Sequence, residues 1–230
     1  MSIGATRDAL SRLLYQRCFW LFVVLLFLIG AVSFVPATDH GRLFLNAVNM
    51  LLLIATVAAV GRTTLSFVLA LLLAVPAVWF QYLGLWNDSD RDLAGSWVFS
   101  AALYFITTAY LLRYVFQPRV MTQDKLFGAA AAYLMLGVLW AYLYAIVGFF
   151  FPQSYMILGQ PGSLVYADAL YLSVTVLTST GFGDVTPLTR AARGVCMVEQ
   201  ITGGLFVAIL IARLAGVYPP RESYVRDGVE

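Results

Sequence analysis

Long apolar stretches alternate with short polar connectors along most of the 230 residues. Six of these stretches are long enough to cross a membrane, which takes an α-helix of about 20 residues. They are residues 18–35, 43–60, 65–85, 97–116, 126–150 and 188–216. A shorter apolar run at 169–177 lies between the last two and predicts a half-length helix. The pattern therefore predicts an all-α membrane protein with six transmembrane helices and one re-entrant helix.

The composition agrees with a bilayer environment. Hydrophobic residues make up 61% of the chain and charged residues 11%, which lies far from ordinary soluble usage. Cys18 and Cys196 lie in or beside apolar stretches without metal-ligand neighbours, so we expect packing residues rather than a metal site. No hydrolase, zinc-protease or phosphate-binding motif occurs, and the net charge of +2 gives no support for nucleic-acid binding. We therefore expect neither an enzyme nor a bound cofactor.

The basic residues are unevenly divided between the two sides of the predicted helices. One side holds ten of them, namely Arg7, Arg12, Arg17, Arg62, Arg113, Arg119, Lys125, Arg213, Arg221 and Arg226. The other side holds four, Arg42, Arg91, Arg190 and Arg193. Since basic loops favour the cytoplasm, this division predicts a multi-pass protein of the inner (plasma) membrane with both termini cytoplasmic.

The segment Thr178–Asp184 follows the half-length helix and contains two glycines at alternate positions, Gly181 and Gly183. Glycine adopts positive φ at little cost, so a short extended segment can turn successive carbonyls toward one axis. Four such segments around an axis would form rings of oxygens able to replace the water shell of a cation.

Together, the helix and this segment resemble the pore helix and selectivity filter of the tetrameric potassium-channel family. The residues that match the family's Thr-Val-Gly-Tyr-Gly-Asp are Ser179, Thr180, Gly181, Phe182, Gly183 and Asp184. The resemblance implies a homotetramer in membrane lipid, with K⁺ as the permeant ion. It also implies that the carbonyls of 179–182 and the Ser179 hydroxyl coordinate dehydrated cations.

Three departures from the family pattern concern the way the filter is held. Phe182 lacks the phenolic hydroxyl that Tyr usually supplies, and Tyr171-Leu172 stand where a Trp pair is common. Thr175 stands where certain bacterial members place a Glu, so Asp184 needs another partner or water. We expect K⁺ selectivity with a less tightly held filter. A weakly selective cation channel and a nonconducting regulatory subunit are the alternatives.

Glu199 is the one ionisable residue deep inside a predicted span. An isolated carboxylate there costs several kcal/mol unless it is paired, hydrogen-bonded or neutral. We predict a hydrogen bond from Glu199 to hydroxyls behind the filter, such as those of Thr175, Ser179 or Thr180. Thr175, Asp184 and Glu199 would then support the filter. The alternative is a Glu199 side chain that faces the water-filled cavity.

Gly203 and Gly204 lie midway along the last span, where Gly203 aligns with the hinge glycine of the family. The pair predicts either a bend used in gating or close helix packing. Four residues beyond them share one face and would line an inner vestibule. They are Val207, Ala208, Ile211 and Ala215. A narrow ring of Ile211 could gate by dewetting.

The chain is predicted to consist of five parts in sequence. They are a cytoplasmic basic segment (1–17), a four-helix bundle similar to a voltage sensor (18–117), a linker (118–125), a pore domain (126–216) and a short cytoplasmic tail (217–230). A voltage sensor needs several basic residues within its fourth helix, whereas residues 97–119 offer only Arg113 and Arg119. We therefore expect a bundle that senses little voltage.

Overall fold

The protein is mainly helical. The computed structural model describes residues 17–32, 34, 64–87, 89–117 and 122–217. The helices described are α2 (Arg17–Val32), α4 (Thr64–Asn87), α5 (Asp90–Val115), α6 (Gln123–Phe150), α7 (Tyr166–Leu177) and α8 (Arg190–Val217). The predicted span at 43–60 lies outside the described residues, as do the basic segment 1–17 except residue 17 and the tail 217–230 except residue 217.

Three helices of the described part are long and apolar enough to cross a membrane. They run over Arg91–Val115, Gln123–Phe150 and Arg190–Ala215. Shorter apolar helices cover Cys18–Val32, Val68–Gly84 and Tyr166–Leu177. The last of these is the predicted half-length helix, which begins three residues before the expected 169. The total of six spans stays a prediction.

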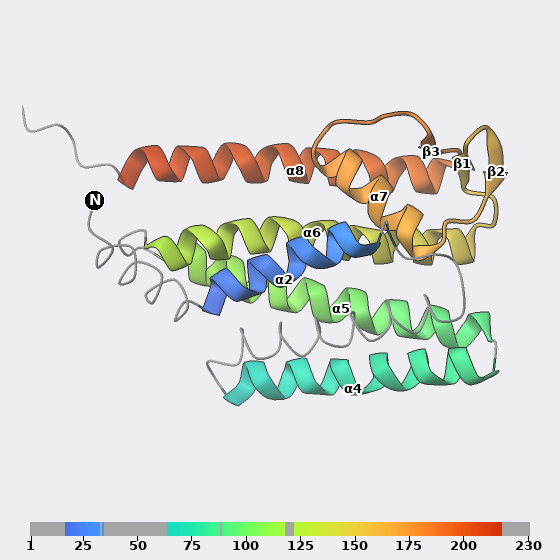
Figure 1. Ribbon diagram of the computed structural model, residues 1–230, viewed down its shortest axis with the longest axis horizontal. Helices are drawn as coiled ribbons and strands as arrows, with labels where there is room; N and C mark the ends of the chain where they lie inside the picture. Colours follow the sequence, from blue (N-terminus) through green and yellow to red (C-terminus); the bar gives the residue numbers. More distant parts are fainter. Residues whose placement is uncertain (1–16, 33, 35–63, 88, 118–121, 218–230) are drawn as a thin grey trace, which may run out of the picture.

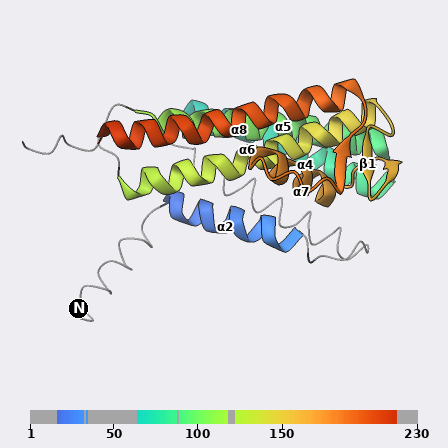
Figure 2. The same ribbon diagram turned by 90° about the horizontal axis from the view of Figure 1, so that it is seen from above.

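Helix α6 lies in the middle of the molecule. Figures 1 and 2 show α8 and α7 on one side of it, α5 on the other, and α2 along a third face, and all four pack against it. Helix α4 packs on α5, on the side away from α6. The bundle thus rests directly on α6 of its own chain.

The sequence of α6 explains its central place. Small residues follow one another from Gly128 to Ala132, so neighbouring helices can approach closely. A Cβ added at Gly128 would lie 3.2 Å from Val115 Cγ2 and 3.4 Å from Cys18 Sγ, on α5 and α2 respectively. A helix that is apolar on nearly every side is buried, and most residues of α6 are buried.

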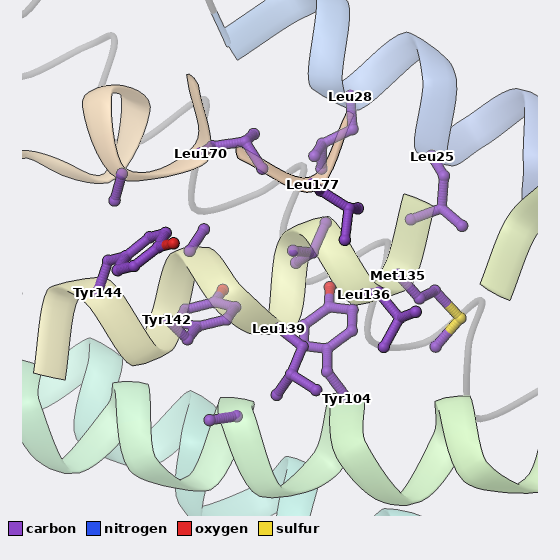
Figure 3. Packing of buried hydrophobic residues seen from close by; sticks show 14 of the residues in the cluster. Leu25, Leu28, Tyr104, Met135, Leu136, Leu139, Tyr142, Tyr144, Leu170 and Leu177 are labelled. Carbon is purple, nitrogen blue, oxygen red and sulfur yellow. The ribbon is translucent and has the colours of Figure 1, made fainter. Parts of the chain in front are cut away.

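Aromatic and aliphatic side chains join the bundle to α6 and α7. In Figure 3, Leu25 of α2 points toward Met135 and α6, while Tyr104 of α5 rises to meet Tyr142. The Tyr104 and Tyr142 rings stack with centroids 5.7 Å apart. The centroid of the Tyr142 ring lies 5.2 Å from that of Tyr166 on α7. This column of three tyrosine rings fixes α7 relative to α5 across α6.

A small antiparallel sheet, which the sequence did not predict, caps one end of the helices. It contains β1 (Tyr155–Ile157), β2 (Gln160–Gly162) and β3 (Val185–Pro187) in the order β2-β1-β3. Leu158 and Gly159 form the two-residue turn between β1 and β2, with φ of 47° and 82°. Positive φ at both turn residues matches the twist of a tight hairpin.

Helices α5 and α6 also begin earlier than the predicted spans. Helix α5 begins at Asp90 rather than 97, because Ser89 adopts the extended backbone of an N-cap and the charged residues after it form the first turn. Helix α6 begins at Gln123, inside the predicted linker. The Thr122 hydroxyl accepts a bond of 3.4 Å from Lys125 N and thereby caps α6.

The ends of α5 and α8 are joined through one backbone carbonyl. Gln117 O accepts a hydrogen bond of 2.6 Å from an Arg213 guanidinium nitrogen and one of 3.3 Å from Lys125 Nζ. The Arg213 guanidinium also lies 5.5 Å from the centre of the Phe116 ring. The last described helix is therefore attached to the bundle as well as to α6 and α7.

Candidate ion-conducting site

The backbone of residues 178–181 turns back onto the end of α7. Four consecutive N–H groups donate to carbonyls in the last turns of that helix. The bonds run from Thr178 to Val174, Ser179 to Val176, Thr180 to Thr175 and Gly181 to Thr175, with N···O distances of 3.1, 2.9, 2.8 and 3.2 Å. Because these N–H groups are taken, the carbonyls are the backbone groups that remain for a ligand.

Backbone φ alternates in sign along the same segment. It is positive at Ser179 (58°), Gly181 (54°) and Gly183 (86°). Thr180 and Phe182, which lie between them, do not have positive φ. Alternation between left- and right-handed φ keeps successive peptide planes similarly oriented, so their carbonyls can point to the same side. Glycine adopts positive φ readily, while Ser179 holds a conformation uncommon for residues with a side chain.

Asp184 ends this segment and is held from three directions. Its carboxylate accepts a hydrogen bond of 2.8 Å from the Tyr171 hydroxyl and one of 3.0 Å from Val185 N. Its backbone carbonyl accepts a hydrogen bond of 2.9 Å from Leu158 N, at the turn of the small hairpin. The partner that the sequence left open for Asp184 is therefore Tyr171 of α7.

The Phe182 ring lies against the same tyrosine. It stacks on Tyr171 with centroids 6.3 Å apart and planes 11° from parallel, yet 71% of Phe182 remains exposed in the single chain. Tyr171 thus contacts the segment twice, through its ring at Phe182 and through its hydroxyl at Asp184. Its position in α7 explains how both residues are placed.

Thr175 supports the segment by its backbone rather than its hydroxyl. Its carbonyl accepts the two bonds from 180 and 181, while its hydroxyl donates to Leu172 O at 2.9 Å. A cleft of about 340 Å³ lies behind the segment, lined by Leu172, Thr175, Cys196 and Gln200 among others. The predicted bond between Thr175 and Glu199 is absent.

Glu199 of α8 is fully buried, with 0% of its surface exposed. The Tyr144 hydroxyl of α6 donates to its Oε2, and the Ser173 hydroxyl of α7 lies 2.6 Å from its Oε1. Hydroxyl partners were expected, but Thr175, Ser179 and Thr180 do not supply them. The alternative of a Glu199 facing a water-filled cavity is wrong for this chain, because three helices cover the side chain.

The two glycines of α8 differ in their surroundings. A Cβ at Gly203 would collide with the carbonyl oxygen of Leu177, the last residue of α7, whereas a Cβ at Gly204 would meet nothing within 4 Å. Close packing therefore accounts for Gly203 but not for Gly204. Beyond them, Val207 and Ile211 are exposed in the single chain, and their place along an inner vestibule stays a prediction.

Three hydroxyl groups on α6 and α7 that contact this region were not predicted from the sequence. Tyr133 donates to Leu177 O at 3.0 Å, Tyr144 donates to Glu199, and Ser173 also lies 2.7 Å from Gly137 O. Residues 137 and 144 lie 4 and 11 positions after residue 133, which places all three on one helix face. That spacing was the available signal, and it was hidden among many aromatic residues.

The oxygens of 178–184 are carbonyls, hydroxyls and one carboxylate. Within the described ranges no group of three His, Cys, Asp or Glu residues could hold a metal ion. A cation bound at this segment would therefore be held mainly by backbone oxygens.

Comparison with known proteins agrees with this geometry. A protein-family profile described as an ion channel matches residues 129–218, which covers most of α6 and continues through α8. Protein LctB of Bacillus caldotenax is 32% identical over 99 residues, a match that spans 35% of this chain and 72% of that protein. The chain belongs to the ion channel family. No solved structure matches it. The channel region thus comprises α6, the sheet, α7, the 178–184 segment and α8.

Proposed function

We propose that this ion channel protein is a homotetrameric, K⁺-selective channel of the inner (plasma) membrane. In it, α7 is the pore helix and residues 178–184 are the selectivity filter. The observation that carries the proposal is the alternation of φ at Ser179, Gly181 and Gly183, combined with N–H groups that all turn toward α7. Such a segment leaves its carbonyls for an ion on the opposite side.

Four copies of the segment around one axis supply stacked rings of oxygen. Rings of carbonyls replace the hydration shell of K⁺ and allow it to pass from one site to the next. The carbonyl end of α7 carries partial negative charge, which favours a cation in the cavity below the filter. The Ser179 hydroxyl adds a further oxygen at the inner mouth.

The exposed surface of α8 supports assembly with further copies of the chain. Its apolar side chains are uncovered along much of the helix in the single chain. Those most exposed are Met197, Val198, Ile201, Leu205, Val207, Ile209 and Ile211. Apolar surface on this scale marks a contact with protein or lipid. A closed ring of four chains covers part of it and places the Val207 and Ile211 face around the inner vestibule.

The four-helix bundle of this channel is proposed to sense little voltage. Moving one elementary charge across the membrane potential is worth about 2.3 kcal/mol per 100 mV, so steep gating needs several charges in the field. Within α5, the basic residues are Arg91 near the start and Arg113 in the last turn. We expect a shallow conductance–voltage relation in planar bilayers, and a steep one would contradict this assignment.

Flux from liposomes tests the proposal directly. Purified protein in vesicles with an outward K⁺ gradient should release K⁺ much faster than Na⁺ under the matched gradient, and Ba²⁺ should block the release. Equal K⁺ and Na⁺ fluxes would indicate the weakly selective cation channel. No flux of either ion from vesicles that contain assembled protein would indicate a nonconducting subunit.

Replacing Tyr171 by Phe should shorten the time for which the filter conducts. The change keeps the ring that stacks on Phe182 and removes the hydroxyl that donates to Asp184. We expect K⁺ flux to begin normally and then decay faster than in the wild type, most clearly at low K⁺ concentration. Tyr82→Phe in α4 makes the same chemical change away from the filter and should leave the time course unchanged. A Tyr171→Phe channel with wild-type decay would show that this bond is dispensable.

A further inference from the structure

The carboxyl group of Glu199 lies in surroundings without a compensating charge. Neither Lys, Arg nor His pairs with it among the residues that the structure describes, and its hydrogen-bond partners are the hydroxyls of Tyr144 and Ser173. The other titratable groups near it are Tyr133 and Tyr155, and Cys196 on its own helix, all of them neutral at pH 7. Burying an unpaired carboxylate is far more costly than burying the neutral acid.

The hydrogens around Ser173 can be counted. Its Oγ lies 2.6 Å from Glu199 Oε1 and 2.7 Å from Gly137 O. Two oxygens at such distances attract each other only with a hydrogen between them, so the two contacts need two hydrogens. The serine hydroxyl has one, and a backbone carbonyl has none. The second hydrogen must therefore belong to Glu199.

We infer that Glu199 is a protonated carboxylic acid that donates a hydrogen bond to Ser173 and so positions the pore helix. Glu199 Oε1–H donates to Ser173 Oγ, Ser173 O–H donates to Gly137 O, and Tyr144 O–H donates to Glu199 Oε2. The chain of bonds runs from α8 through α7 to α6 and returns from α6 to α8. Its role in conduction rests on the proposed function, whereas the protonation does not.

The protonated acid acts as a positioning residue because Ser173 lies one turn before the end of α7. The carbonyls of the two residues that follow Ser173 and of Val176 accept the filter N–H groups. A shift of α7 at Ser173 would therefore move the filter backbone. With a carboxylate at 199, the Ser173 hydrogen could satisfy either Glu199 or Gly137, but not both.

Infrared spectroscopy of the full-length channel tests the protonation without altering the site. The chain contains three glutamates, Glu199, Glu222 and Glu230. In an E222Q/E230Q background, glutamate labelled with ¹³C in its side-chain carboxyl reports on Glu199 alone. At pH 7 we expect a C=O stretch of a protonated acid that shifts to lower wavenumber on labelling and disappears in Glu199→Gln. Asp92→Asn, on the first turn of α5, should leave this band unchanged. A labelled signal found only at carboxylate frequencies would overturn the inference.

Three variants test the positioning role. Glu199→Gln keeps one donor for Ser173 and one acceptor for Tyr144, so it should retain K⁺ flux and the preference for K⁺ over Na⁺. Glu199→Leu and Ser173→Ala both break the chain of bonds, and each should lose K⁺ flux or its selectivity. Loss of flux in the Gln variant, or normal flux in the Leu variant, would overturn the positioning role. If protein with wild-type Glu199 shows the C=O band of the protonated acid but conducts no K⁺, the proposed function is refuted and the protonation of Glu199 still holds.

Discussion

Gly203→Ala is expected to destabilise the channel and to abolish K⁺ flux. The added Cβ would collide with the carbonyl oxygen of Leu177 and come within 3.0 Å of Leu177 Cδ1, so α8 and α7 must separate. That carbonyl also accepts the Tyr133 hydroxyl at 3.0 Å, and a shift of Leu177 would strain this bond as well. Overpacking of a well-filled contact costs about 1–3 kcal/mol, and a rigid backbone atom favours the upper end.

Gly204→Ala is the matched control. It adds the same methyl group to the next residue of the same helix, where nothing lies within 4 Å in the single chain. Alanine is favoured over glycine inside a helix by about 1 kcal/mol, so this variant should unfold at the same or a higher temperature. Thermal unfolding of the two purified variants in one detergent, followed by liposome flux, compares them directly.

The pair of variants also separates the two interpretations of these glycines. If the glycines act by letting α8 bend, both substitutions should stiffen the helix and change gating while the unfolding temperature stays high. If Gly203 acts through its contact with Leu177, only Gly203→Ala should lower the unfolding temperature. Equal loss of stability in both variants would contradict the packing explanation.

The long helices could be predicted because their apolar runs far exceed the length of any strand. The predicted ends of 126–150 and 188–216 lie within three residues of α6 and α8. The start of α5 was misplaced because Asp90, Arg91 and Asp92 look like loop residues. Ser89 followed by acidic residues is also the usual pattern of a helix start, and the structure adopts that pattern.

The small sheet could not be predicted from periodicity. Each strand has three residues, too few for an alternation of apolar and polar positions to be visible. The turn between β1 and β2 contains Leu158 where Asn or Asp would have signalled a hairpin. This sheet matters for the site because its turn holds the carbonyl of Asp184.

The candidate site could be predicted in its backbone but not in its supports. Glycines at alternate positions mark the proposed filter within seven residues of sequence, and both glycines have positive φ. The partners of Glu199 lie 55 and 26 residues earlier in the chain, at Tyr144 and Ser173. The predicted partner Thr175 is two residues from Ser173, and on a helix that separation turns its hydroxyl to another side. Only the packing of α6, α7 and α8 decides which hydroxyl meets Glu199.

Gly183→Ala is expected to abolish selective K⁺ flux while leaving the fold intact. Gly183 has a φ of 86°, a value that residues with a Cβ rarely adopt, and its surroundings are open in the single chain. The effect therefore comes from the backbone rather than from a clash. Holding a non-glycine residue in such a conformation costs about 1–3 kcal/mol. The peptide would relieve this strain by rotating, which takes a carbonyl out of its ring.

Gly159→Ala provides a control with the same backbone strain outside the filter. Gly159 has a φ of 82°, sits in the hairpin turn and has nothing within 4 Å. The two variants should lose similar stability on thermal unfolding. Only the Gly183 variant should lose the preference for K⁺ over Na⁺ in the liposome assay.

The expected size of the Gly183 effect follows from the strain and the symmetry of the pore. A cost of about 1–3 kcal/mol shifts the balance between two backbone states by about 5- to 150-fold in each chain. In a tetramer a single rotated chain already removes one oxygen from a ring, so conduction requires all four to stay in place. We therefore expect the factor by which K⁺ flux falls to exceed the factor by which the backbone equilibrium shifts in one chain. Selective flux at the wild-type rate from Gly183→Ala would contradict the assignment of residues 178–184 as the filter.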